Sequence, residues 1–302
     1  MMTTNLTQHL RVYEPHPGIF AFYDGRVEGQ RFSDQPNWVD EGALSVGIAS
    51  YAILRGDHAL IYDTHVSVPH ALAEKAALQA KGAQRFTVVL SHWHLDHVAG
   101  TAAFSGSPVI ANARTDAHLR AKKADIEAGM SSGMPVIDPL ILPTKVFTGQ
   151  MVLWIGDLEV HLIEANIHSD DATVLWLPKD RILLAGDTVE DTVTYVSQPE
   201  GFAAHLQDLG RLAALDAQFV LPNHGCPDRI AAGGYGASLL TATQTYVRFL
   251  MRLRDEPDLA DTPLRDIIGP DLATGTLIWY EPYAEVHLEN VQASLAIYGH
   301  NG

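Results

Sequence analysis

Three histidines and one aspartate stand close together in the stretch Ser91-His92-Trp93-His94-Leu95-Asp96-His97. Neutral imidazole nitrogens and carboxylate oxygens are the ligands that zinc and similar divalent ions take in proteins. His92 and His94 alternate with Trp93, so an extended backbone would point both imidazoles to one side. Asp96 and His97 follow after a turn and can face a second point nearby. A loop of solvated histidines is the plain alternative, but four donors at this spacing favour a metal site.

Three further candidate donors also follow apolar runs of the chain: His168, Asp187 and His224. The first donor stretch itself comes directly after residues 86–90, a short β-branched run that is typical of a buried strand. Each of the three residues alone is more often a loop residue or a helix cap than a ligand. Their joint occurrence at strand ends in one α/β chain indicates a shared site. Asp63 also follows a predicted strand and could orient a metal-bound histidine or simply cap its loop.

The elements that would position these donors alternate between strands and helices, which is typical of an α/β fold. Hairpin turns are predicted at residues 55–57 and 156–157. The predicted strands cover residues 12–23, 46–54, 59–62, 86–90, 108–111, 152–155, 158–163, 172–177, 182–185 and 218–221. The predicted helices cover residues 69–81, 97–104, 114–128, 202–215, 237–254 and 285–298.

We expect one domain over residues 1–302, because no linker or internal repeat divides the sequence. Residues 112–150 are less regular and are predicted to be a lid-like insertion, whose apolar side chains could form a substrate wall, a homodimer contact or ordinary packing. Residues 236–302 are predicted to be a helical extension. Within it, His287 and Asn290 lie three residues apart on one helical face and could reach the site or pack against the sheets.

Composition limits the partners of this chain. The formal net charge is -16 and the sequence pI is about 5.2, so no basic surface is expected for nucleic acid. The same charge disfavours strongly anionic substrates unless metal ions supply positive charge locally. Cys226 is the single cysteine, which fits a reducing compartment. The sequence starts without the pattern of a secretory signal and has no apolar stretch long enough for a bilayer, so we expect a cytoplasmic protein. The expected partner is a small-molecule substrate.

At the candidate metal donors the chain resembles the metallo-β-lactamase superfamily. Within it, the resemblance is to the two-metal hydrolase branch of lactonase-like and glyoxalase II-like enzymes. The resemblance rests on the donor stretch and on the segments around His168, Asp187 and His224, and it covers about residues 43–225. It implies an αββα sandwich of two mixed β-sheets flanked by helices, with the site at one edge of the sheets. It also assigns His92, His94 and His168 to one metal, Asp96, His97 and His224 to the other, and Asp187 to both.

The chemistry that the resemblance implies is hydrolysis at two divalent ions, zinc first, with iron and manganese as further candidates. Two such ions lower the pKa of a bridging water towards neutrality and polarise a substrate carbonyl, so the hydroxide is the expected nucleophile. Asp96 and Asp187 would hold and orient the metals and this hydroxide. Protonation of the leaving group could come from a metal-bound water or from Tyr195, which stands further along the chain from the bridging aspartate than the tyrosine of related lactonases. The expected substrate is a lactone, ester or related acyl compound.

Three alternatives stay open at the level of sequence. A β-lactam or a phosphotriester could be hydrolysed by the same residues. A single iron could oxidise a persulfide, although the intact set of Asp96, His97 and His224 speaks against that. A sensor without turnover could keep the same fold, which the full ligand set makes less favourable.

Overall fold

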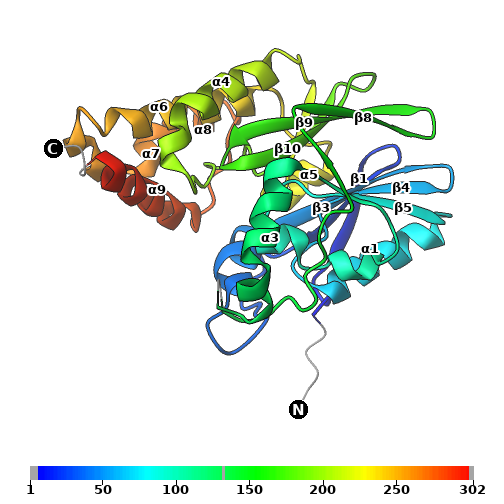
Figure 1. Ribbon diagram of the computed structural model, residues 1–302. Helices are drawn as coiled ribbons and strands as arrows, with labels where there is room; N and C mark the ends of the chain where they lie inside the picture. Colours follow the sequence, from blue (N-terminus) through cyan, green and yellow to red (C-terminus); the bar gives the residue numbers. More distant parts are fainter. Residues whose placement is uncertain (1–5, 131–132, 299–302) are drawn as a thin grey trace.

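Two β-sheets packed face to face form the centre of the protein, as a computed structural model that describes residues 6–130 and 133–298 shows (Figure 1). Within these residues the first sheet has the strand order β1-β2-β3-β4-β5-β6-β7. Its strands are β1 (Arg11–His16), β2 (Ile19–Asp24), β3 (Ile48–Arg55), β4 (His58–Tyr62), β5 (Arg85–Val89), β6 (Val109–Asn112) and β7 (Lys145–Phe147). The strands from β1 to β4 pair antiparallel and those from β4 to β7 pair parallel, so this sheet is mixed.

The second sheet has the order β12-β11-β10-β9-β8. Its strands are β8 (Gln150–Ile155), β9 (Leu158–Ile167), β10 (Ser169–Leu177), β11 (Ile182–Gly186) and β12 (Phe219–Pro222). Only β11 and β12 pair parallel, so this sheet is mixed as well. Side chains such as Tyr51, Leu60, Leu162 and Leu184 fill the space between the two sheets and are fully buried.

Helices cover the outer faces of both sheets (Figure 1). The α-helices are α1 (Val68–Ala80), α2 (Leu95–Val98), α3 (Ala113–Glu127), α4 (Phe202–Ala213), α5 (Pro227–Ala231), α6 (Ser238–Arg252), α7 (Leu264–Ile267), α8 (Gly269–Ala273) and α9 (Tyr283–Tyr298). Apolar side chains of α1 and α3 pack against the first sheet and those of α4 pack against the second, while α6 packs on α4 and α9 packs on α6. The predicted αββα sandwich is therefore confirmed. In the described residues no helix is long and apolar enough to cross a membrane.

Local sequence explains where several of these elements begin and end. Ser67 caps α1, since its side chain accepts a hydrogen bond from the backbone N–H of His70, and Pro69 occupies the first turn, where a missing N–H costs nothing. The hairpin between β3 and β4 turns at Gly56, whose φ of 60° lies in the left-handed region that glycine tolerates best.

The predicted helix at residues 97–104 differs in the structure. Helix α2 starts two residues earlier and ends at Val98, and a separate 3-10 turn covers Thr101–Phe104. Gly100 lies between them against the chain that follows β4, where an added Cβ would stand 2.0 Å from the carbonyl oxygen of Thr64. This close approach brings the end of α2 onto the neighbouring loop.

The segment predicted as a lid contains two regular elements that belong to the sandwich. Helix α3 packs against β10 and β6, and β7 pairs parallel with β6 as the last strand of the first sheet. We did not expect β7 from the sequence, because two of its three residues are exposed and carry no apolar pattern. Whether the connecting residues act as a lid stays a prediction.

Candidate metal centre

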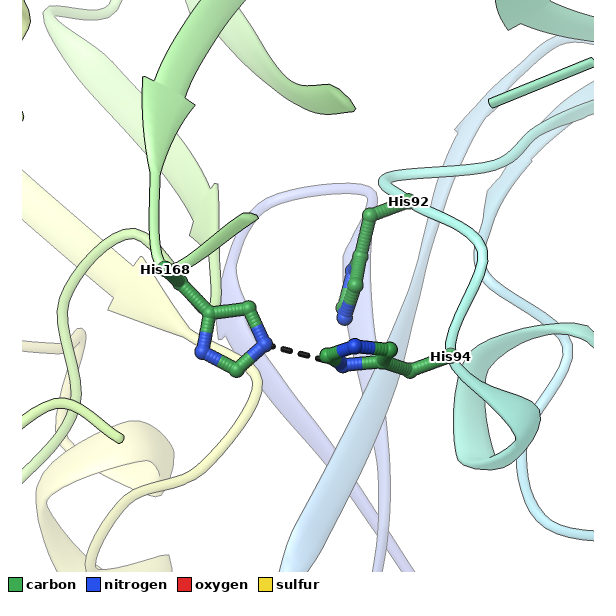
Figure 2. Close-up of side chains that lie close together, drawn as sticks. All are labelled: His92, His94 and His168. Atoms are coloured by element: carbon green, nitrogen blue, oxygen red, sulfur yellow. Dashed lines mark hydrogen bonds between the residues drawn. The ribbon is translucent and has the colours of Figure 1, made fainter. Parts of the chain in front are cut away.

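The seven side chains predicted as metal ligands converge at one edge of the sandwich, where β5, β9, β11 and β12 end. They form two groups of three whose donor atoms all lie within 4.8 Å of one another, with Asp187 between them. Figure 2 shows the first group: His92 and His94 extend from the loop after β5, and His168 faces them from the turn between β9 and β10. Nε2 of His168 lies 2.9 Å from Nδ1 of His94. The second group consists of Asp96, His97 and His224.

Asp187 is the carboxylate that reaches both groups. Its Oδ2 atom lies 3.5 Å from Nε2 of His92 and 3.8 Å from Nε2 of His168, which belong to the first group. The same oxygen lies 3.0 Å from Nε2 of His97 and 3.4 Å from Nε2 of His224, which belong to the second. This central position is the one that a bridging ligand requires.

Asp96 serves the second group alone. Its Oδ2 atom lies 3.4 Å from Nε2 of His97 and 3.4 Å from Nε2 of His224. Helix α2 places Asp96 and His97 side by side at its first turn, directly after the loop that carries the histidines of the first group. One short segment thus supplies donors to both groups.

Each of four histidines is fixed by a hydrogen bond from the ring nitrogen that faces away from the centre. These pairs join His92 Nδ1 to Ser91 Oγ at 2.8 Å, His97 Nδ1 to Asp63 Oδ2 at 2.9 Å, His168 Nδ1 to the carbonyl oxygen of Tyr195 at 2.8 Å, and His224 Nδ1 to the carbonyl oxygen of Gly47 at 2.7 Å. Such bonds set the orientation of a metal-binding imidazole and leave Nε2 free for the ion.

Asp63 makes the contacts that both of its predicted roles require. Its Oδ2 atom accepts the hydrogen bond from His97 and a second one, at 2.6 Å, from the side-chain amide of Asn223. Its Oδ1 atom accepts from the backbone N–H of Ser91 at 2.6 Å and so holds the start of the donor loop. Asp63 has a left-handed φ of 65°, and His168 has one of 67°. Non-glycine residues rarely adopt this conformation, and it concentrates at functional sites.

Three buried polar atoms at this place lack a hydrogen-bond partner among the described residues: Nε2 of His92, Nε2 of His97 and Oδ1 of Asp187. Buried polar groups are nearly always paired in native proteins. A divalent cation would satisfy all three, because each atom is an electron-pair donor. The residues present therefore fit a metal centre.

Electrostatics favour the deprotonated, metal-binding form of His92, His94 and Asp187 and the protonated form of His97 and His224. Burial, together with neighbouring histidines, lowers the pKa of His92 well below its usual value and that of His94 to about 3. Burial raises the pKa of Asp187, but His97 and His224 outweigh it and hold that pKa well below the usual range. In His97 and His224 burial lowers the pKa, yet the carboxylates, led by Asp187, raise it well above normal. A bound cation would displace these protons, which is the usual coupling between metal binding and proton release.

The donor cluster, meaning the seven side chains, opens into a cavity of about 550 Å³. One wall comes from the turn before β3 and another from the start of α9. The lining consists of Glu41, Gly42, Ser45, Val46, His94, Asp96, His168, Asp187, Glu190, Tyr195, His224, Pro282, Glu285, Val286 and Glu289. Tyr195 therefore lies in the cavity as expected for a residue near the substrate, while its role as a proton donor stays a prediction. No described residue of the segment 112–150 belongs to this lining.

Glu190 is a cavity residue that sequence reasoning missed. Its side chain is 3% exposed, and burial raises its pKa to about 7. One oxygen accepts the backbone N–H of Tyr195 at 2.9 Å, and the other accepts the phenol of Tyr283 at 3.1 Å. Its place three residues after Asp187 at a strand end was the signal that could have indicated it.

Asn290 holds the same segment from the other side. Its Oδ1 atom accepts the backbone N–H of Val196 at 2.8 Å, and its side-chain amide donates to the carbonyl oxygen of Thr194 at 3.0 Å. His287, in contrast, is buried against Tyr246, and neither it nor Asn290 lines the cavity. Glu190 and Asn290 thus anchor the chain around Tyr195, whose carbonyl oxygen orients His168.

Comparison with known proteins places these features in a family context. The model of the Metallo-beta-lactamase superfamily matches residues 46–224, which include all seven donors. Among curated proteins, the putative transcription factor avaE of Aspergillus versicolor is 26% identical over 208 residues. That match covers 60% of this chain and 57% of the relative, so the chain spans little more than half of the relative's length.

Solved structures resemble the chain over most of its length. The DIM-1 metallo-beta-lactamase exposed to ceftazidime has 22% sequence identity and a TM-score of 0.59, covering 80% of this chain and 97% of that one. The metallo-beta-lactamase from Pontibacter korlensis has 17% identity and a TM-score of 0.60, with 80% and 99% covered. The enzyme from Hirschia baltica has 17% identity and a TM-score of 0.56, with 80% and 98% covered. At these identities the likeness shows a shared fold.

Proposed function

The chain belongs to the metallo-beta-lactamase superfamily. We propose that it is a metal-dependent hydrolase that cleaves a lactone, ester or related acyl bond with two divalent ions, most favourably zinc. The observation that carries the two-ion proposal is the position of Asp187 between two groups of three donors. A single-ion site would not need a second complete group.

The residues that would hold the ions follow from this geometry. One ion would take His92, His94 and His168, the other would take Asp96, His97 and His224, and Asp187 would be shared. Two divalent ions supply an activated water nucleophile near neutral pH and a Lewis acid for the acyl oxygen.

The chain itself supplies binding and proton transfer around this centre. Burial raises the pKa of Tyr195, with contributions from Glu289 and Glu190, so its phenol stays protonated at neutral pH. A protonated phenol in the cavity can donate its proton to the leaving group of a cleaved ester or lactone. Val46, Pro282 and Val286 give the wall apolar surface for the hydrocarbon part of a small molecule.

A substrate panel tests this proposal. The zinc-loaded protein should be assayed with lactones, aryl esters, thioesters, β-lactams and phosphotriesters, before and after chelation. We expect the highest kcat/KM on a lactone or another carboxylic ester, loss of that rate on chelation and its return with added zinc. Turnover of β-lactams or phosphotriesters alone would contradict the acyl-ester assignment, and no turnover by a fully loaded protein would contradict the proposal as a whole.

A further inference from the structure

Beyond the donor cluster, the cavity wall carries only negative charge. The additional carboxylates in the lining are Glu41, Glu190, Glu285 and Glu289. No lysine or arginine belongs to the lining in the described part of the chain. The other polar side chains of the wall outside the donor cluster, Ser45 and Tyr195, are neutral.

Three of these carboxylates have no partner in the described part of the chain. Among the described residues, the side chains of Glu41, Glu285 and Glu289 form no ion pair and accept no hydrogen bond. Glu285 and Glu289 stand four residues apart on α9, so both project from one helical face into the cavity. Like charges at this spacing destabilise a helix, and a bound cation would relieve that repulsion.

Arg26 does not neutralise this wall. The guanidinium of Arg26 is paired with Asp191 at 3.3 Å and lies 4.2 Å from the ring centroid of Tyr280, and its side chain is only 7% exposed. It supports the segments that carry Glu190 and Pro282 but does not reach the cavity. A carboxylate tail beside Glu41, Glu285 or Glu289 would therefore meet repulsion that no lysine or arginine of the described lining offsets.

An aromatic side chain beside these charges could also contact a cation. The aromatic ring of Tyr195 lies in the same cavity, 5.8 Å from the ring of His168. Aromatic faces attract ammonium groups, and most strongly where water is partly excluded. At the floor, the unpartnered and buried Oδ1 atom of Asp187 marks the end of the cavity where the ions and the acyl group would lie.

We propose that the site selects acyl substrates that carry a positively charged amine on the side away from the scissile bond. This proposal rests on the proposed function, because the acyl group must lie at the metal centre for its tail to reach Glu285 and Glu289. The apolar residues Val46 and Val286 would contact the hydrocarbon that joins the two ends. Substrates with a carboxylate tail should bind poorly for the same reason.

Binding of matched hydroxamates tests the proposal without requiring turnover. A hydroxamate head chelates the ions, and one alkyl chain can end in a trimethylammonium group, an uncharged tert-butyl group of the same shape, or a carboxylate. Calorimetry on the zinc-loaded full chain should give about tenfold tighter binding of the cationic compound than of the neutral one, with the carboxylate weakest and the differences shrinking in high salt. Equal affinities, or tightest binding of the carboxylate, would overturn the proposal.

Variants separate this proposal from the proposed function. The double variant Glu285→Gln and Glu289→Gln should lose most of the preference for the cationic compound over the neutral one. Glu200→Gln removes one negative charge from an exposed residue outside the lining and should keep the preference. If the loaded protein binds none of the three hydroxamates, the metal centre and the proposed function are both wrong. If it binds all three and the double variant changes nothing, only the charge selection is wrong.

Discussion

Oδ2 of Asp187 lies 3.0 Å from Nε2 of His97 in the second group of donors and 3.5 Å from Nε2 of His92 in the first, so one oxygen reaches both groups. A residue in contact with both groups couples the occupancy of one to that of the other. Asp187→Asn keeps the size of the side chain and removes its charge. We expect bound metal to fall to about one ion per chain or fewer, and hydrolysis to fall at least about 100-fold. Metal analysis after dialysis, with circular dichroism as a check of folding, measures this; wild-type metal content and rate would contradict the bridging role.

Asp63 should raise the metal affinity of the centre through its hydrogen bond with His97. Asp63→Asn removes the charged acceptor for His97 Nδ1 while keeping the side chain's shape. Loss of such a partner weakens metal affinity about 10- to 100-fold, and we expect a change of this size in a competition titration with a zinc chelator. Glu159→Gln is the control, because it breaks a carboxylate–histidine pair, with His161 on β9, outside the donor cluster. Equal affinities of the two variants would show that the contact does not tune the centre.

Tyr195 contributes a phenol to the cavity and a backbone carbonyl oxygen to His168. One substitution tests the phenol alone. Tyr195→Phe removes the phenol but leaves the backbone carbonyl oxygen that orients His168. If the phenol protonates the leaving group, kcat should fall about 100-fold for esters with basic leaving groups and much less for nitrophenyl esters, with unchanged metal content. The rate on esters with basic leaving groups should be divided by the rate on nitrophenyl esters. If this ratio is the same in the variant and the wild type, Tyr195 is not the proton donor.

The buried carboxyl of Glu74, which lies outside the donor cluster, should make the stability of the protein depend on pH. Burial raises its pKa from 4.5 to about 8, and the hydrogen bond from Ser50 lowers it only in part. The folded chain therefore keeps a proton that the unfolded chain releases, so stability falls as the pH rises from about 4.5 to about 8. Glu74→Gln abolishes this loss.

We expect Glu74→Gln to raise the free energy of unfolding by about 2 to 4 kcal/mol at a pH of about 8.5 and by much less at about pH 5. Urea unfolding of the metal-free protein at both pH values measures the difference, and metal-ligand titration cancels because it is common to both chains. A stabilisation that does not depend on pH would contradict the raised pKa of Glu74.

The donors could be predicted because local patterns determine their place. A β-branched run such as residues 86–90 predicts a buried strand, and the polar residues that follow it must lie at the sheet's edge. The same reasoning placed His168, Asp187 and His224 at other strand ends, and the structure brings all of them together. The two mixed sheets followed from the family resemblance carried by the same residues.

The surroundings of the donors could not be predicted because they depend on contacts between distant segments. Glu190 is buried by Tyr283, which lies 93 residues away in the sequence, and Arg26 is paired with Asp191 across 165 residues. The acidic wall needs α9 to lie beside the cavity, and the sequence of α9 indicates a helix without indicating where it packs. Charge selection by the site could therefore be argued only from the structure.

Metal analysis of protein purified without added metal tests the two-ion centre most directly. The proposed assignment predicts about two divalent ions per chain, and a hydrolytic rate that recovers only as the metal-free protein takes up the second equivalent of zinc. One iron per chain, with oxygen consumption on a persulfide and no hydrolysis, would contradict it.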